Sequence, residues 1–132
     1  MSGDLRLEPV SAPLQPHDRL CLELDGSLRL AFNDARKFGR AWLESDPARI
    51  LSGLGPEPLD PDFTVEDFHR RLAAARRQVK PLLLEQSFLA GLGNIYTDEA
   101  LHAARIHPLR LSNSLTKEET TALWMAIRRV LE

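Results

Sequence analysis

The stretch "LAGLGNIYTDEALHAARIHP", residues 89–108, decides how the second half of the chain folds. Gly91 and Gly93 mark a tight turn, and Asn94 opens a helical pattern that runs to about Arg105. Glycine permits turn conformations and lets a ligand approach the backbone closely. A helix start also presents free N–H groups and the positive end of the helix dipole. The stretch therefore predicts either a phosphate-binding turn or a plain helix corner with Asn94 as its cap.

Two well-known glycine motifs do not match this turn. A dinucleotide-binding fingerprint needs a third glycine where Tyr96 stands, and it follows a strand, whereas the residues before Gly91 have a helical pattern. A P-loop needs Gly-Lys followed by Ser or Thr, which the sequence lacks. On the glycines alone, the plain helix corner is the simpler interpretation.

The composition is that of a soluble globular protein. A chain of 132 residues can bury one modest core or two small ones. Cys21 is the single cysteine, which excludes an internal disulfide and a four-cysteine zinc site within this chain. The sequence has no apolar run of membrane-spanning length and no basic-then-apolar leader, so we expect no membrane partner and a cytoplasmic location.

The charges are segregated along the chain, although the net charge is only −2. Acids crowd residues 57–67, whereas residues 69–80 contain five basic side chains and no acid. A second basic cluster, "ARKFGR" (35–40), has an aromatic residue inside it. This pattern is typical of a protein with one basic face, although a solvated arginine face on an ordinary helix explains residues 69–80 equally well.

Alternating apolar residues predict strands in the first part of the chain. "RLCLELDGSLRLAFND" (19–34) contains two alternating runs joined at Asp25-Gly26, a strong hairpin signal. "KFGRAWLE" (37–44) could supply one further strand. Three or four strands form only part of a sandwich or barrel, so we expect an exposed edge and a marginally stable sheet.

The second part of the chain has helical periodicity. Thr64 with Asp67 and Thr116 with Glu119 are spaced as capping boxes, which begin two helices. Pro81 begins a shorter helical run, "PLLLEQSF" (81–88). The last helix carries a stripe that we expect to be buried, formed by Leu123, Trp124, Ile127 and Val130. The predicted organisation is a β-domain at 1–45, a Pro/Gly/Asp-rich connection at 46–63 and a helical domain at 64–132.

Longer motifs resemble one known family. "KPLLLEQSFLAGLGNIYTDEALHAARIHPLR" (80–110) resembles the helix–two-turn–helix (H2TH) element of the formamidopyrimidine-DNA glycosylase (Fpg/Nei, MutM-like) family. "MSGDLRLEP", "FNDARKFGRAWL" and "LGPEPLDPDF" resemble, in the same order, the second half of the family's β-sandwich and its interdomain connection. The resemblance covers nearly the whole chain. It implies an α+β fold, in which the C-terminal part of an antiparallel β-sandwich precedes an all-helical H2TH domain.

The resemblance also implies a function in DNA repair. Members of this family bend duplex DNA, flip a damaged base out of the helix, cut its glycosidic bond and cleave the strand. The implied partner is double-stranded DNA with a damaged base or an abasic site. Asn94 and the backbone around Gly93 match the phosphate anchor of the two-turn element, and Lys80 matches a second phosphate contact.

Three further residues match the side chains that fill the gap left by the flipped base. Arg36 matches the arginine inserted into the gap, Phe38 the aromatic wedge between base pairs, and Met1 a third void-filling side chain. An aromatic stacked on a base and a nearby cation can offset part of the cost of flipping. Without the resemblance, Phe38 would be interpreted as a sandwich-core residue and Arg36 as a surface charge.

The residues that carry the family's chemistry have no match in this sequence. The resemblance implies an N-terminal proline as nucleophile, the glutamate after it, a catalytic lysine and a C-terminal zinc finger. We therefore expect the central part of a bifunctional glycosylase/AP lyase for oxidised purines, inactive by itself, with no catalytic residue, metal or cofactor of its own. Ala35 and Lys37 depart from the family's usual proline and arginine, which leaves the preferred lesion open.

Two other functions remain open at this point. The chain could be a non-catalytic DNA-binding module that keeps only the phosphate anchor and the wedge. It could also be a helical protein-interaction module that presents the apolar stripe of its last helix, in which case Trp124 would matter more than Arg36.

Overall fold

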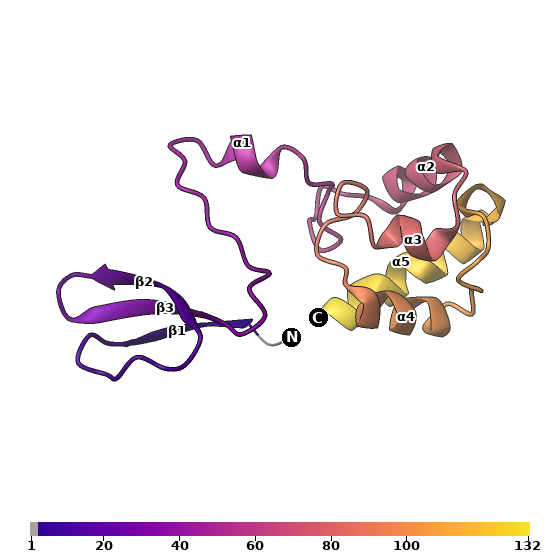
Figure 1. Cartoon of the computed structure of the whole chain (residues 1–132). Coiled ribbons are helices and arrows are strands. Elements are labelled where there is room, and N and C mark those ends of the chain that lie inside the picture. Colours follow the sequence, from indigo (N-terminus) through magenta and orange to yellow (C-terminus); the bar gives the residue numbers. More distant parts are fainter. Residues whose placement is uncertain (1–2) are drawn as a thin grey trace. The chain divides into compact units, whose positions relative to one another are not determined.

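The computed structural model describes residues 3–132 of the chain, which form two compact units. One unit ends at Ser45 and the other begins at Asp46. Figure 1 shows a small sheet in the first unit and a cluster of helices in the second. Each unit is described by itself. The predicted α+β class, with strands preceding helices, is confirmed.

The first unit is a three-stranded antiparallel sheet with strand order β1-β3-β2. Its strands are β1 (Gly3–Pro9), β2 (Asp18–Leu24) and β3 (Leu28–Asp34). The predicted hairpin joins β2 to β3, and both Asp25 and Gly26 have positive φ, as primed hairpin turns require. The further strand expected at 37–44 does not form. Three N–H groups of the adjoining loop bond to the Asp34 carboxylate instead of to a neighbouring strand.

The two faces of this sheet differ sharply in polarity. The register aligns apolar side chains across all three strands in two rungs, Leu5–Phe32–Leu20 and Leu7–Leu30–Leu22. Leu5 is 66% exposed and Leu7 is 62% exposed, so other described residues leave this face largely uncovered. An alternating strand must place its apolar residues on one face, but that face is buried only if a second layer packs on it.

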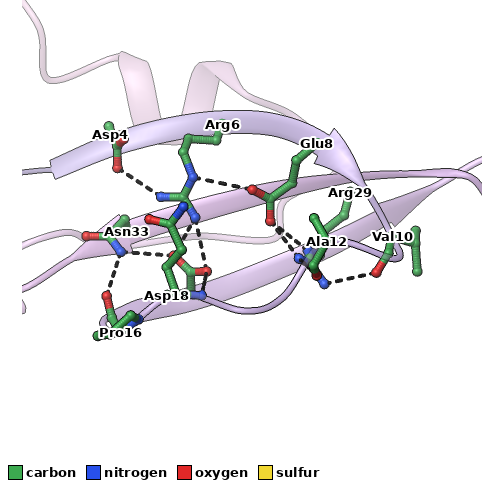
Figure 2. Close-up of polar contacts among 10 residues, drawn as sticks. Asp4, Arg6, Glu8, Val10, Ala12, Pro16, Asp18, Arg29 and Asn33 are labelled. Atoms are coloured by element: carbon green, nitrogen blue, oxygen red, sulfur yellow. Dashed lines mark hydrogen bonds and ion pairs between the residues drawn. The ribbon is translucent and has the colours of Figure 1, made fainter.

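The opposite face carries a network of ion pairs, drawn in Figure 2. Arg6 Nη2 donates to both carboxylate oxygens of Asp18, at 2.8 and 3.0 Å, and Asn33 Nδ2 donates to the same carboxylate at 2.9 Å. Arg29 Nη2 donates to Glu8 at 2.6 Å. The hydrogen bond from Arg6 lowers the pKa of Asp18 to about 2, and the bond from Arg29 lowers the pKa of Glu8. The Asp18 carboxylate therefore stays ionised well into the acid range.

The second unit contains five α-helices and one short 3-10 helix within the described residues. They are α1 (Ala48–Leu51), α2 (Val65–Ala75), α3 (Val79–Leu83), α4 (Asn94–Ala103), η1 (Ser112–Ser114) and α5 (Lys117–Leu131). Both expected capping boxes form, from Thr64 to Asp67 and from Thr116 to Glu119. Helix α1, which lies within the expected connection, was not predicted because four residues are too few to show a helical period.

The helices enclose one hydrophobic core. Phe68 of α2 is fully buried, and its ring lies 5.6 Å from the ring of Trp124 and 6.4 Å from those of Phe63 and Phe88. Leu123 and Ile127 of α5 are also fully buried in this core. The apolar stripe of the last helix is therefore used inside its own unit. This finding argues against a protein-interaction module that presents this stripe.

None of the helices between residues 3 and 132 is long and apolar enough to cross a membrane.

Candidate nucleic-acid interface

The glycine turn forms immediately before α4. Gly91 has φ of +89°, a left-handed conformation that favours glycine. Gly93 is the N-cap residue of α4 and has extended backbone angles. A Cβ atom built on either glycine would meet no heavy atom within 4 Å. The space in front of the turn is therefore open, and a ligand can reach the backbone at the start of the helix.

Asn94 is not the helix cap, which corrects the interpretation of this turn as a plain capped corner. It is the first residue of α4, the cap position belongs to Gly93, and no side-chain hydrogen bond caps the helix. Because Asn94 already has helical backbone angles, its side chain cannot reach back to the N–H groups that a cap residue satisfies. Its carboxamide is exposed at the helix start, where the first N–H groups lack intrahelical partners.

Gln86 holds the glycine turn in shape, a role that sequence reasoning missed. Its Oε1 accepts a hydrogen bond from the Gly91 N–H at 2.9 Å, and its Nε2 donates to the Leu92 carbonyl at 2.8 Å. One side-chain amide thus takes the place of two backbone partners within the turn. The only sequence signal was a polar residue within the short run "LLLEQSF", which the helical interpretation left unexplained.

Lys80 lies beside the first turns of α4. Its Nζ is 2.7 Å from Asp98 Oδ1 and 2.9 Å from Asp98 Oδ2. Asp98 follows Asn94 by four residues, and residues spaced by four share one face of a helix. The structure therefore brings Lys80, Asn94 and the open turn at Gly93 to the same side of α4. The Lys80 side chain is 28% exposed and is held by an acid of this chain.

The loop after β3 carries the second group of predicted site residues. The Asp34 carboxylate accepts hydrogen bonds from the N–H groups of Arg36 at 3.2 Å, Lys37 at 3.0 Å and Gly39 at 2.6 Å. These bonds, that from Gly39 first, lower the pKa of Asp34. A Cβ atom on Gly39 would lie 2.3 Å from Phe32 Cζ, so this position has room only for glycine. The loop is therefore folded tightly around one buried carboxylate.

Arg36 and Phe38 project from this loop. Phe38 is 76% exposed among the described residues. The Arg36 guanidinium carbon lies 5.2 Å from the centroid of the Phe38 ring, within the range of a cation–π contact. An exposed aromatic ring beside a cation can stack on a nucleobase. Met1 lies outside the described residues.

The described residues do not fit a zinc site. No three side chains from His, Cys, Asp and Glu between residues 3 and 132 are grouped as metal ligands require. Cys21 is exposed on the sheet.

Comparisons with known proteins place the chain in a family. Residues 54–132 match the family model for the formamidopyrimidine-DNA glycosylase H2TH domain. The chain belongs to the formamidopyrimidine-DNA glycosylase family. The match begins within the 46–63 connection and includes the glycine turn, Lys80 and Gln86.

Individual members of the formamidopyrimidine-DNA glycosylase family align with almost the entire chain. The glycosylase of Herpetosiphon aurantiacus is 47% identical over 133 residues, which cover 99% of this chain and 49% of that protein. The Escherichia coli enzyme is 41% identical over 134 residues, with the same two coverages. The chain therefore spans about half the length of the curated relatives it matches.

Solved structures from this family share the fold. The Lactococcus lactis Fpg bound to DNA containing an abasic site matches with a TM-score of 0.84 and 38% identity, covering 99% of this chain and 49% of that one. A MutM structure in complex with DNA containing carbocyclic 8-oxo-G matches with a TM-score of 0.85 and 37% identity, covering 99% and 50%.

Proposed function

We propose that this chain binds duplex DNA at a damaged base or abasic site, as the DNA-binding part of a bifunctional DNA glycosylase/AP lyase that removes oxidised purines. The observation that carries the proposal is the open glycine turn at the start of α4, with Lys80 beside it. Family membership and the DNA-bound state of similar solved proteins support it. On this proposal the chain works in base-excision repair, in the cytoplasm where bacterial DNA lies.

The helical unit supplies the phosphate contacts on this proposal. The free N–H groups at the start of α4 and the positive end of its dipole attract a phosphate, and the exposed Asn94 amide donates a further hydrogen bond. Lys80 adds a charge on the same side of the helix. Each such contact contributes only about 1 kcal/mol, so binding depends on their convergence.

On this proposal, the loop after β3 recognises the gap that a flipped base leaves in the duplex. Extruding a base costs a few kcal/mol, and stacking of an aromatic side chain on a neighbouring base returns about 1–3 kcal/mol. Phe38 is exposed enough to stack, and Arg36 lies against its ring. The arginine donors can then pair with the base left without a partner. Damaged and abasic sites are preferred because their bases have already lost stacking or pairing.

We further propose that the chain by itself does not catalyse the reaction and holds no cofactor. The resemblance assigns nucleophilic attack on the sugar C1′ to the secondary amine of an N-terminal proline, and proton transfer to the next glutamate. Neither residue has a counterpart in the printed sequence. Incubation with a duplex containing 8-oxoguanine should therefore leave both strands intact, and strand cleavage would contradict this part of the proposal.

Fluorescence anisotropy tests the binding proposal. The chain is titrated against a duplex with a stable abasic-site analogue and against an undamaged duplex, at two salt concentrations. We expect tighter binding to the abasic duplex and a clear loss of affinity at higher salt, because phosphate contacts release counterions. Equal binding to both duplexes would contradict the wedge role assigned to Arg36 and Phe38. No binding to either duplex would overturn the proposal.

Two substitutions test the phosphate anchor. Lys80→Ala and Asn94→Ala should each weaken binding to both duplexes by roughly fivefold to tenfold, and Lys80→Ala should also reduce the salt dependence. Lys117→Ala is the matched control, because it removes the same charge from an exposed position at the start of α5. Equal effects of Lys80→Ala and Lys117→Ala would show a general charge effect and contradict the assigned anchor.

A further inference from the structure

Asp34 joins the end of the sheet to the loop that carries Arg36 and Phe38. Its main chain belongs to the sheet: the Asp34 N–H donates to the His17 carbonyl at 3.0 Å, and Arg19 Nε donates to the Asp34 carbonyl at 3.1 Å. Its side chain belongs to the loop, because Oδ1 and Oδ2 together accept three loop N–H groups. Asp34 is only 6% exposed. The carboxylate is therefore a buried connection between β3 and the loop.

The loop conformation depends on this carboxylate. Lys37 has φ of +59°, which costs a non-glycine residue roughly 1–2 kcal/mol. Nearby backbone N–H groups turn inward toward Asp34, and the Phe38 side chain projects outward with 76% of it exposed. Gly39 completes the arrangement, because its Cα lies against the Phe32 ring and leaves no space for a Cβ. Hydrogen bonds to a buried acceptor offset the backbone strain.

We propose that Asp34 is a positioning residue for recognition of damaged DNA. With Gly39, it holds the loop so that Phe38 and Arg36 are already arranged for insertion before the chain meets DNA. This inference rests on the proposed function, since it needs the wedge role of Phe38. Preorganisation matters because ordering a free loop at the moment of binding would consume much of the energy that one base–aromatic stack returns.

The substitution Asp34→Asn tests this role with little change in volume. Oδ1 accepts the N–H groups of Arg36 and Lys37, and Oδ2 accepts that of Gly39. An asparagine side chain has one acceptor oxygen and one donor NH₂, so one side of the arrangement must place a donor against a donor. Gly39→Ala disturbs the same loop from the other end, through its contact with Phe32.

Asp18→Asn is the matched control. Asp18 is a buried carboxylate of the same sheet, with its side chain 2% exposed, but it accepts from Arg6 and Asn33 and from no residue of the 35–39 loop. The same chemical change is thus made in the same unit without touching the loop. Phe38→Ala provides the reference for complete loss of the wedge.

The experiment measures the ratio of affinities for the abasic and undamaged duplexes, with the fluorescence of a 2-aminopurine placed opposite the gap as a direct report of stacking. Asp34→Asn and Gly39→Ala should lower the ratio by roughly tenfold, close to Phe38→Ala, and should remove the fluorescence change. Affinity for the undamaged duplex should not change. Asp18→Asn should keep both the ratio and the signal.

Three other outcomes would contradict the inference about Asp34, and one of them would also contradict the proposed function. If Asp34→Asn keeps the ratio and the fluorescence change, Asp34 does not position the loop, although the proposed function stands. If Asp18→Asn lowers the ratio as much as Asp34→Asn does, the effect is one of sheet stability and the inference is wrong. If the unchanged chain shows no preference for the abasic duplex, the proposed wedge function fails and the inference fails with it.

Discussion

The sheet and the helical unit use the same kind of apolar residue with opposite results. Leu83 of α3 is fully buried, whereas Leu7 of β1 is 62% exposed. Both leucines lie on regular apolar faces, but the helices supply one another with partners, and the three strands form a single layer. An apolar face stabilises a fold only when a second layer covers it. The helical unit therefore contains its own stabilising core, and the sheet relies on hydrogen bonds and the ion pairs of its polar face.

The two units also resemble each other in one respect. Each presents its candidate site on a tight loop that is held by one polar side chain, Asp34 in the sheet unit and Gln86 in the helical unit. Both side chains satisfy backbone groups that the turn would otherwise leave without partners. The sites are thus supported independently, each by its own unit.

The largest expected effect is a difference between two identical substitutions. Leu83→Ala should lower the free energy of unfolding of the helical unit by about 3 kcal/mol, because it leaves a cavity in a closed core. Leu7→Ala should change stability by less than about 0.5 kcal/mol, because the side chain is already exposed. Urea unfolding followed by the helical signal in circular dichroism measures the first, and NMR signals from β1 measure the second. Similar losses for the two would mean that the leucine face of the sheet is covered in solution.

The second largest effect that we expect is a difference between the two units in their stability at acid pH. The pKa of Asp18 falls from an ordinary 3.8 to about 2 in the folded sheet, so the ionised form stabilises the fold. That stabilisation is complete above about pH 4 and is lost as the pH falls toward 2. The sheet should therefore lose its NMR signals in this range while the helical core persists. The pKa values of the capping acids Asp67 and Glu119 are also lowered, so their protonation will weaken the starts of α2 and α5. Asp18→Asn should already be less stable at neutral pH and should show a weaker acid transition.

A smaller effect is expected from the side chain that holds the glycine turn. Gln86→Ala removes the two hydrogen bonds that the Gln86 side chain makes to the glycine turn, which should lower the stability of the helical unit by about 1–2 kcal/mol and weaken DNA binding. Gln78→Ala is the control, because Gln78 stands at the start of α3 without a side-chain capping bond. Thermal unfolding and anisotropy on the same samples compare them. Equal losses of thermal stability and DNA affinity in the two variants would contradict the role of Gln86 in supporting the turn.

The smallest effect concerns the acid that pairs with Lys80. Asp98→Asn should release the Lys80 ammonium for a phosphate and raise DNA affinity by about two- to fivefold, the scale of an exposed ion pair. Glu99→Gln removes the same charge from the neighbouring exposed position. Only Asp98→Asn should lose its effect when combined with Lys80→Ala. A similar gain from both single variants would indicate general repulsion of DNA by acids.

Much of the local structure was predictable because it depends on neighbours in the sequence. The hairpin at Asp25-Gly26 and the capping boxes at Thr64 and Thr116 all formed where their motifs stand. The strand expected at 37–44 did not form, since alternation cannot reveal that loop N–H groups are taken by Asp34. The support role of Gln86 was equally hidden, because its partners are known only once the turn is folded.

The sequence by itself determined the hairpin, the two helices that begin at capping boxes and the glycine turn, since these follow from apolar periods, caps and turn residues within a few positions of one another. The short helix expected at 81–88 instead spans Val79–Leu83. Its longer motifs also indicated the family. Only the tertiary structure decided that Gly93 is the N-cap residue of α4, that Lys80 lies beside that helix in an ion pair with Asp98, and that Phe38 is exposed. The physical reason is distance along the chain: Lys80 and Asp98 are 18 residues apart, and only packing of α3 near α4 brings their charges together.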